Sequence, residues 1–375
     1  MSSRRLGGRA FAVAVWTASG GADRTASHRP VIEPDAAASL SRRDHGDAGA
    51  GGGQAPSSAG MNRRSLLIRT AGLAAVVGGA WWARETLLWP KPTLAFVESG
   101  ATPWLAYARN ALVPTVRVRL GGLEVVALID SGAQYSVIDR ALVAALPSAG
   151  RSLFDMPLVA YGVGGGAQVG RGTTLAVDLP GLSIRGLRAA ILDLGPLASR
   201  EGLHTPLILG QDVLGEAVLA LDPRRRHARL VRREAFVRPP DLAPAIVRRQ
   251  GGSLVTEVMV EDSAVQAVVD TGASALLGLS REAASGAGLL DGRPQGRGVS
   301  LVLGGALRSA TVEARTVTFA DHLYRRVSVG VFDQPPLPNF PGGLVGMEAF
   351  NGRRVAMDLG AGALFVSRPL DLTVG

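Results

Sequence analysis

The 375-residue sequence contains no cysteine. This absence excludes disulfide bonds, cysteine nucleophiles and zinc sites built on cysteine ligands. It is compatible with export, where free thiols are a hazard. Histidine is scarce too, and His204, His227 and His322 stand alone without the spacing of metal ligands. We therefore expect no metal and no other cofactor.

Lysine is almost absent, although the chain is basic. Lys91 is the only lysine, so arginine supplies nearly all of the positive charge in a chain of formal net charge +9. The arginine runs at 224–226 and 232–233 lie beside expected turns and have no aromatic residues among them. Such runs favour a solvated surface over a nucleic-acid interface. We expect no nucleic-acid partner.

Aromatic residues make up 5% of the chain and charged residues 19%, whereas glycine occurs 49 times. A chain of this length can bury two or more cores, and its composition favours a globular, β-rich protein over a disordered one. No Gly-x-Ser-x-Gly elbow precedes an expected helix, which leaves a serine hydrolase of that type without support.

The amino-terminal region differs from the rest. Residues 1–60 lack a sustained apolar period, so we expect a disordered leader or sequence upstream of the true start. Residues 61–86 begin at Met61 with a paired arginine and an apolar stretch, which is typical of a twin-arginine signal. An uncleaved inner-membrane tether and a short buried helix are the alternatives. The signal predicts an exported protein, periplasmic or anchored in the inner membrane facing the periplasm. Residues 87–114 are expected to be a linker.

One tetrapeptide pattern occurs twice. Asp-Ser-Gly-Ala occupies residues 130–133 and Asp-Thr-Gly-Ala occupies residues 270–273, and an apolar run precedes each. The alternating sequence before each Asp predicts a hairpin, turning at Gly121-Gly122 in the first half and near Asp262-Ser263 in the second. A lone Asp-Ser-Gly is typically a turn. Two copies in matched surroundings favour a paired site.

The sequence around the two motifs also repeats, in the same order. A short helix candidate follows each motif, at 140–146 and 281–287, and a glycine-rich segment comes after each helix. Each half closes with two apolar residues and a glycine, which lies 80 residues after the Asp in the first half and 76 in the second. This duplication predicts two lobes, residues 115–237 and 251–368, joined by a linker at 238–250.

Each half resembles a retropepsin-type aspartic protease unit, with an Asp-Ser/Thr-Gly-Ala turn, a glycine-rich flap hairpin, and two apolar residues with a glycine before a short helix. The resemblance covers residues 115–366 and extends to the bacterial retropepsin-like proteins, here with two units fused in one chain. It implies a mostly β, bilobal acid-protease fold of two pseudo-symmetric β-barrel lobes with short helices. Gln211 and Met347 depart from the pattern, because retroviral enzymes usually have arginine after the closing glycine.

The resemblance implies that Asp130 and Asp270 form the catalytic pair. Two adjacent carboxylates share one proton, so one of them can activate a water while the other holds the proton. Around the pair we expect hydroxyls that lock the two loops together, glycines that permit close backbone approach, and small alanines. These supporting residues are Ser131, Gly132, Ala133, Thr271, Gly272 and Ala273.

The glycine-rich segments are expected to be flaps that cover the cleft and bind substrate. Residues 161–170 loosely match a dinucleotide-binding fingerprint, but the sequence that follows is strand-like and not helical, which argues against that function. Tyr161 is expected either to touch substrate or to pack within its strand. The candidate flap residues are Tyr161, Gly164, Gly165, Gly166, Gly304 and Gly305.

These patterns predict an aspartic endopeptidase that hydrolyses a peptide or protein substrate with a water activated between Asp130 and Asp270. We expect a monomer, because each half of the chain supplies one Asp. The alternative is an exported, non-catalytic peptide-binding or scaffold protein that retains the aspartic protease fold. A wide separation of the two carboxylates would favour that alternative.

Overall fold

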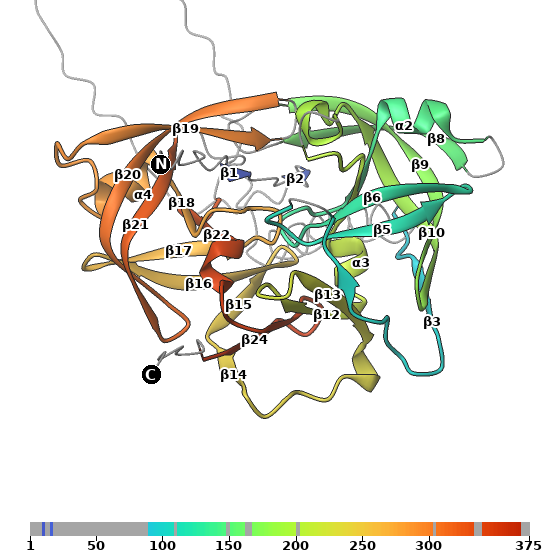
Figure 1. Cartoon of the computed structure of the whole chain (residues 1–375). Coiled ribbons are helices and arrows are strands. Elements are labelled where there is room, and N and C mark those ends of the chain that lie inside the picture. Colours follow the sequence, from blue (N-terminus) through green and yellow to red (C-terminus); the bar gives the residue numbers. More distant parts are fainter. Residues whose placement is uncertain are drawn as a thin grey trace, which may run out of the picture. The chain divides into compact units, whose positions relative to one another are not determined.

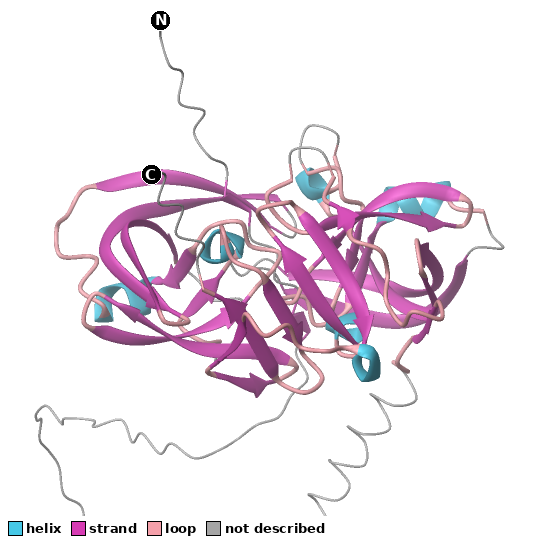
Figure 2. Cartoon of the chain, turned by 60° about the horizontal axis from the view of Figure 1, so that its bottom comes forward, coloured by secondary structure: helices cyan, strands magenta, loops and turns pink. Residues whose placement is uncertain are grey.

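The computed structural model describes residues 10–11, 16–17, 89–108, 111–147, 151–161, 167–199, 203–302, 305–333 and 340–368. These residues form a mostly β structure with few and short helices (Figures 1 and 2). The expected signal or tether at 61–86 lies outside them, as does the expected leader apart from residues 10–11 and 16–17. No helix in the described ranges is long and apolar enough to cross a membrane.

In the first half of the chain, strands form a closed barrel that we call lobe 1. They are β3 (Thr93–Phe96), β5 (Thr115–Leu120), β6 (Leu123–Ile129), β7 (Ser136–Asp139), β8 (Arg151–Tyr161), β9 (Ala167–Leu179), β10 (Leu182–Leu192) and β11 (Leu207–Leu209). The pairing runs from β9 through β5, β6, β11, β7 and β10 and back to β9, which closes a ring of six strands. β8 pairs with β9 but is not part of the ring, and β3 pairs with β10.

The second half repeats this arrangement as lobe 2. Its strands are β15 (Val247–Gln250), β16 (Ser253–Val260), β17 (Ser263–Val269), β18 (Leu277–Ser280), β19 (Gln295–Val302), β20 (Gly305–Phe319), β21 (His322–Phe332) and β22 (Gly343–Val345). The ring runs from β20 through β16, β17, β22, β18 and β21 and back to β20. Two barrels of the same order confirm the predicted duplication and the mostly β, bilobal fold.

A third, six-stranded sheet joins the two lobes. It consists of β14 (Leu242–Ala245), β24 (Ala363–Ser367), β23 (Val355–Asp358), β12 (Ala217–Asp222), β13 (His227–Arg232) and β4 (Leu105–Ala106), in that order. β12 of the first half and β23 of the second pair in the middle, with Leu219 opposite Met357. We call this sheet the shared sheet.

Both segments that the sequence marks as linkers contribute strands. Residues 87–114 contain β3 and β4, and residues 238–250 contain β14 and β15. These strands pair at sheet edges, where an extended segment can satisfy its backbone groups without an alternating apolar pattern of its own. Pro244 within β14 is tolerated because an edge strand does not need every N–H donor.

Two short strands near the amino terminus extend the outer hairpins. β1 (Ala10–Phe11) runs parallel to β19, and β2 (Trp16–Thr17) runs antiparallel to β8. Since β8 and β19 belong to the two predicted flap hairpins, this part of the leader lies beside both hairpins.

Short helices lie between the strands. They are α2 (Arg140–Ala145), α3 (Gln211–Leu214), α4 (Arg281–Gly286), η3 (Gly195–Leu197), η4 (Arg233–Ala235) and η5 (Met347–Phe350). Side chains cap the two helices that follow the motifs. The Asp139 carboxylate accepts from Ala141 N at 2.9 Å, and Ser280 Oγ accepts from Ala283 N at 3.1 Å. Such caps satisfy N–H groups that the first helical turn leaves unpaired.

The hairpin before the second motif turns at Glu261-Asp262, one residue earlier than predicted. Glu261 adopts a left-handed backbone with φ of 52°, which is unfavourable for a residue with a side chain. Its carboxylate compensates, because Oε1 accepts hydrogen bonds from Arg315 N at 2.8 Å and from Arg293 Nη1 at 3.1 Å. The turn is thereby tied to β20.

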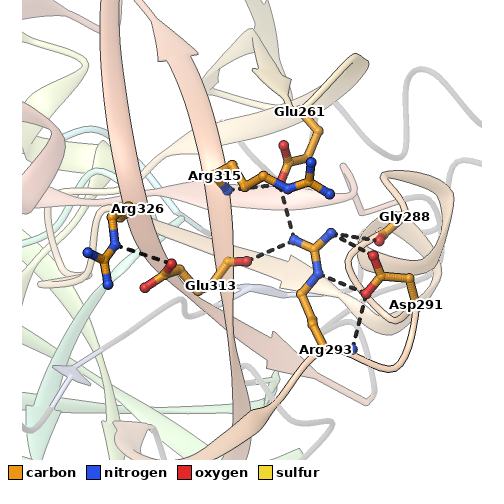
Figure 3. A network of polar contacts seen from close by, with 7 residues as sticks. All are labelled: Glu261, Gly288, Asp291, Arg293, Glu313, Arg315 and Arg326. Carbon is orange, nitrogen blue, oxygen red and sulfur yellow. Dashed lines mark hydrogen bonds and ion pairs between the residues drawn. The ribbon is translucent and has the colours of Figure 1, made fainter.

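Arg293 is the centre of a polar network on lobe 2 (Figure 3). Its guanidinium also donates to Asp291 Oδ1 and Oδ2, each at 2.8 Å, and to the backbone oxygens of Glu313 and Gly288, at 2.8 and 3.3 Å. One side chain thus joins the turn at Glu261, the loop after α4, and β20. Among the described residues, the side chain of Arg326, at the edge of the same network, contacts Glu313 in an ion pair of 3.4 Å.

Substituting Arg293→Ala should lower the free energy of unfolding by about 1–2 kcal/mol, because it leaves several acceptors around a 15% exposed side chain without their donor. Arg326→Ala is the matched control in the same network. Its side chain is 81% exposed, and we expect a change within about 0.5 kcal/mol. Urea unfolding of both variants measures the difference. Equal losses would show that the network does not stabilise lobe 2.

Candidate active site

The two Asp-Ser/Thr-Gly turns lie at the ends of equivalent strands. β6 and β17 end immediately before Asp130 and Asp270. The neighbouring parallel strand holds each Asp in place: Asp130 N donates to Leu209 O of β11 at 3.0 Å, and Asp270 N donates to Val345 O of β22 at 2.8 Å. Equivalent pairing in the two lobes therefore presents both carboxylates in the same way.

Four hydrogen bonds cross between the two motifs. Ser131 N donates to Thr271 Oγ1 at 2.9 Å, and Thr271 N donates to Ser131 Oγ at 3.0 Å. The hydroxyls then donate across the interface, Ser131 Oγ to Val269 O and Thr271 Oγ1 to Ile129 O, both at 2.8 Å. All four bonds are buried, and we call this set the reciprocal lock. It fixes the loop of lobe 1 to the loop of lobe 2.

The two glycines of the motifs lie against the opposite carboxylates. A Cβ on Gly132 would lie 2.7 Å from Asp270 Cγ, and a Cβ on Gly272 would lie 2.6 Å from Asp130 Cγ. No residue with a side chain fits at either position without displacing a carboxylate. The backbone of each lobe thus touches the Asp of the other, and the structure brings both carboxylates to one place.

Backbone N–H groups orient one oxygen of each carboxylate. Asp130 Oδ1 accepts from Gly132 N at 2.8 Å and from Ala133 N at 3.1 Å, and Asp270 Oδ1 accepts from Gly272 N at 2.8 Å. Both residues are 0% exposed. Neither Oδ2 atom accepts from a backbone or hydroxyl donor in the described part of the chain, and the two carboxyl groups hydrogen-bond to each other. The pair is therefore arranged to share one proton.

Burial raises the pKa of both carboxyl groups, because the charged form loses its hydration. The pKa of Asp130 lies well above its usual value, through burial first and the charge of Asp270 second. Burial raises the pKa of Asp270 to about 6, against hydrogen bonds that act in the opposite direction. The pair consequently retains a proton at a pH where isolated aspartates are fully ionised.

Gln211, which the sequence marked only as a departure from the family pattern, also crosses between the lobes. Its Nε2 donates to Ser131 O at 2.8 Å and to Ser253 Oγ, at the start of β16, at 2.9 Å. Gly252 makes room for it, because a Cβ there would lie 2.4 Å from Gln211 Oε1. Gln211 therefore fastens the Asp130 loop to the first barrel strand of lobe 2.

The equivalent residue of lobe 2 is apolar. Met347 is buried in the core and makes the same backbone contact as Gln211: Met347 N donates to Ala273 O and Gln211 N to Ala133 O, both at 2.8 Å. The two motif alanines, Ala133 and Ala273, thus accept these hydrogen bonds through their backbone oxygens. The two loops thus make the same backbone contact, but a hydrogen-bonding side chain holds the first loop and an apolar side chain packs beneath the second.

The next position along the chain is acidic in both halves. Asp212 accepts from Ser136 N at 3.1 Å and from Ser136 Oγ at 2.8 Å, and Glu348 Oε2 accepts from Leu276 N at 3.1 Å. Both carboxylates hold the chain just beyond a motif. The sequence analysis did not predict these roles, although each half has an acidic residue two places after its closing glycine.

The predicted flap segments form hairpins. β8 pairs with β9, with Tyr161 opposite Ala167, and β19 pairs with β20, with Val302 opposite Gly305. Gly164, Gly165, Gly166 and Gly304 lie outside the described residues. Elsewhere in the described ranges, no three His, Cys, Asp or Glu side chains gather where a metal could be held.

A comparison with protein families matches residues 116–213 and 256–349 to the family described as aspartyl protease. The chain belongs to the aspartyl protease family. One match falls in each lobe and contains one Asp-Ser/Thr-Gly motif, which confirms two fused retropepsin-like units. A comparison of this aspartyl protease family member with curated proteins finds no match.

Among solved structures, this aspartyl protease family member is similar to Basic 7S globulin from soybean, at 11% identity and a TM-score of 0.42. It is also similar to conglutin gamma, a basic 7S globulin from lupine seeds, at 14% identity and a TM-score of 0.43. Each likeness covers 74% of this chain and 95% of the other. Similarity at this level has no bearing on activity.

The raised pKa values predict that stability falls as the pH rises. Both native pKa values exceed that of an unfolded Asp, so the native state binds the extra protons. The resulting stabilisation is complete below about pH 4 and is lost as the pH rises, through about pH 6 for Asp270. The free energy of unfolding of the wild type, minus that of an Asp130→Asn/Asp270→Asn variant, should fall by about 1–3 kcal/mol from pH 4 to 7.5. A constant difference, or one that grows with pH, would contradict this. The subtraction removes the contribution of Asp212, whose pKa burial also raises to about 6.

The hydrogen bonds of Gln211 predict an asymmetric response to substitution. Gln211→Met copies the residue of lobe 2 but leaves Ser131 O and Ser253 Oγ without their donor, and should cost about 1–3 kcal/mol. Met347→Leu, a conservative change at the equivalent core position, should cost less than about 1.5 kcal/mol. Urea unfolding compares the two. If Gln211→Met costs no more than Met347→Leu, the two hydrogen bonds do not stabilise the fold.

Proposed function

We propose that this aspartyl protease family member is an aspartic endopeptidase that hydrolyses peptide bonds with a water held between Asp130 and Asp270. The supporting observation is the state of the pair: two fully buried carboxyl groups that hydrogen-bond to each other, have raised pKa values, and lie on loops joined by reciprocal hydrogen bonds. Such a costly arrangement of buried carboxyl groups is typical of a functional site.

The reaction begins with one proton shared by the pair. We describe it with that proton on Asp130, whose pKa both burial and the charge of Asp270 raise, and with Asp270 ionised. Asp270 takes a proton from the water as the water oxygen attacks the scissile carbonyl carbon. Asp130 donates its proton to the carbonyl oxygen. As the tetrahedral intermediate collapses, the C–N bond breaks, the leaving nitrogen takes up the proton held by Asp270, and Asp130 takes back a proton from one hydroxyl of the intermediate, which restores the starting state of the pair.

The substrate class in this proposal is a peptide or protein bound in an extended conformation. The outer strands β8 and β19 of the two long hairpins pair with β2 and β1 over two residues each, which supports the proposal that an extended chain can bind there through main-chain hydrogen bonds. One chain contains both aspartates, which supports a monomer as the active form. The paired arginine and apolar stretch at 61–86 support export to the periplasm, with this segment as signal or inner-membrane tether.

Incubating the protein with a diverse peptide mixture across pH 4–8, with products identified by mass spectrometry, tests the proposal. Asp130→Asn and Asp270→Asn should each lower the cleavage rate at least about 100-fold, because each removes a proton carrier from the reaction. Asp262→Asn, an exposed aspartate in the turn between β16 and β17, is the control and should cleave as the wild type does.

Two results would refute endopeptidase activity. Cleavage that persists in both Asn variants would come from another source. Absence of cleavage by the wild type, together with a rise in its melting temperature on binding a statine-type transition-state mimic, would instead establish a non-catalytic peptide-binding protein.

A further inference from the structure

A groove of about 900 Å³ lies along the shared sheet, and none of its lining residues belongs to the motifs or the flap hairpins. Arginines from four separate segments of the chain meet there: the turn between β12 and β13, the segment before β14, the segment before β23, and the end of β24. These arginines are Arg224, Arg225, Arg238, Arg353, Arg354 and Arg368. Only two acidic residues, Asp222 and Asp241, lie among them.

The six arginines divide into anchored and available side chains. Arg353 is structural: it is 4% exposed and donates to Ser367 O and Ala320 O, both at 2.8 Å. Arg238 donates to Leu242 O and lies over the Phe365 ring. These two shape the wall of the groove, and their donors are largely used.

The other arginines keep donors for a ligand. Arg354 forms an ion pair with Asp241, and Arg225 lies 3.9 Å from Asp222 with 80% of its side chain exposed. A carboxylate on one side of a guanidinium leaves its other edge able to bind an anion.

Arg224 and Arg368 are exposed, and the side chain of neither forms a hydrogen bond or ion pair with another residue that the structure describes. The positive charge of the groove is therefore only partly neutralised by the protein itself. Exposed like charges that lie close together repel one another, and binding a multivalent anion lowers this repulsion.

A smaller hollow of about 260 Å³ continues the groove. It shares Asp222, Arg225 and Arg354 with the groove and adds His227 and Trp104, whose exposed fraction is 44%. An exposed indole beside guanidinium groups offers an apolar contact next to the charged one. The groove thus offers positive charge to a ligand, and the adjoining hollow adds an apolar surface.

From this arrangement we propose that the arginine groove binds a ligand that carries several phosphate groups. Guanidinium groups are planar, permanently charged and matched to bidentate contact with phosphate. The volume is near the upper end of small-molecule sites and exceeds what a single phosphate needs. Such phosphates have two sources, a free polyphosphate and clustered phospholipid headgroups at a membrane surface.

The groove is a site separate from the aspartate pair, because none of its lining residues belongs to a motif. In Figure 1, β14 and β24 of the shared sheet lie at the bottom of the view, and β19 of the lobe 2 flap hairpin lies along the top. Binding at the groove therefore does not depend on peptide hydrolysis, and its test needs no activity measurement.

The test compares the full-length wild type with two double variants that each remove two positive charges. Arg224→Ala/Arg368→Ala alters the groove without breaking a bond to another described residue. Arg140→Ala/Arg325→Ala removes two exposed arginines of the barrels that do not line the groove. Calorimetric titration with sodium tripolyphosphate measures the free source. Co-sedimentation with phosphatidylcholine vesicles, with and without phosphatidylglycerol, measures the lipid source.

We expect the groove variant to bind at least about tenfold more weakly than the wild type to one of the two probes, and the control variant to bind within about twofold. A loss confined to tripolyphosphate identifies a free polyphosphate as the source, and a loss confined to the phosphatidylglycerol-dependent fraction identifies lipid headgroups. Equal losses in the two variants would overturn the proposal, because net charge alone would then explain binding. So would a wild type that binds neither probe.

Discussion

The reciprocal lock between Ser131 and Thr271 is the interaction on which the rest of the structure depends. Two carboxylates buried at one point are unfavourable, since each loses hydration and the two repel one another when both are ionised. The lock fixes the loops against this repulsion with four buried hydrogen bonds. The barrels, the closing glycines and the shared sheet can be understood as the framework that holds those loops in register.

The duplication supplies a symmetric backbone, but the side chains around it are not symmetric. Gln211 makes a polar bridge to lobe 2, whereas Met347 at the equivalent position joins the apolar core. A single chain allows such divergence, because each half is encoded separately. An identical pair of subunits would have to rely on the substrate to distinguish the two aspartates.

The shared sheet has a second consequence. It joins the halves through β12 and β23, so the turns and chain ends around it bring together residues that are far apart in sequence. The arginine groove arises there for this reason. The protein therefore has two chemically different regions, a buried acidic pair between the motifs and a basic, exposed groove along the shared sheet, each of which can be altered without touching the other.

The sequence by itself determined the two Asp-Ser/Thr-Gly turns, the repeated hairpins before them, the short helices after them and the mostly β, two-lobed fold, because these features depend on local alternation and on a repeated order. Only the tertiary structure decided that residues 87–114 and 238–250 form strands, that Gln211 reaches Ser253, and that arginines 224 and 368 share a groove. Those contacts join segments far apart in the chain, whose local sequence does not specify the partner. Each motif alone was a weak signal. The fold made the two into one site, because the reciprocal lock and the facing glycines bring the two carboxylates together.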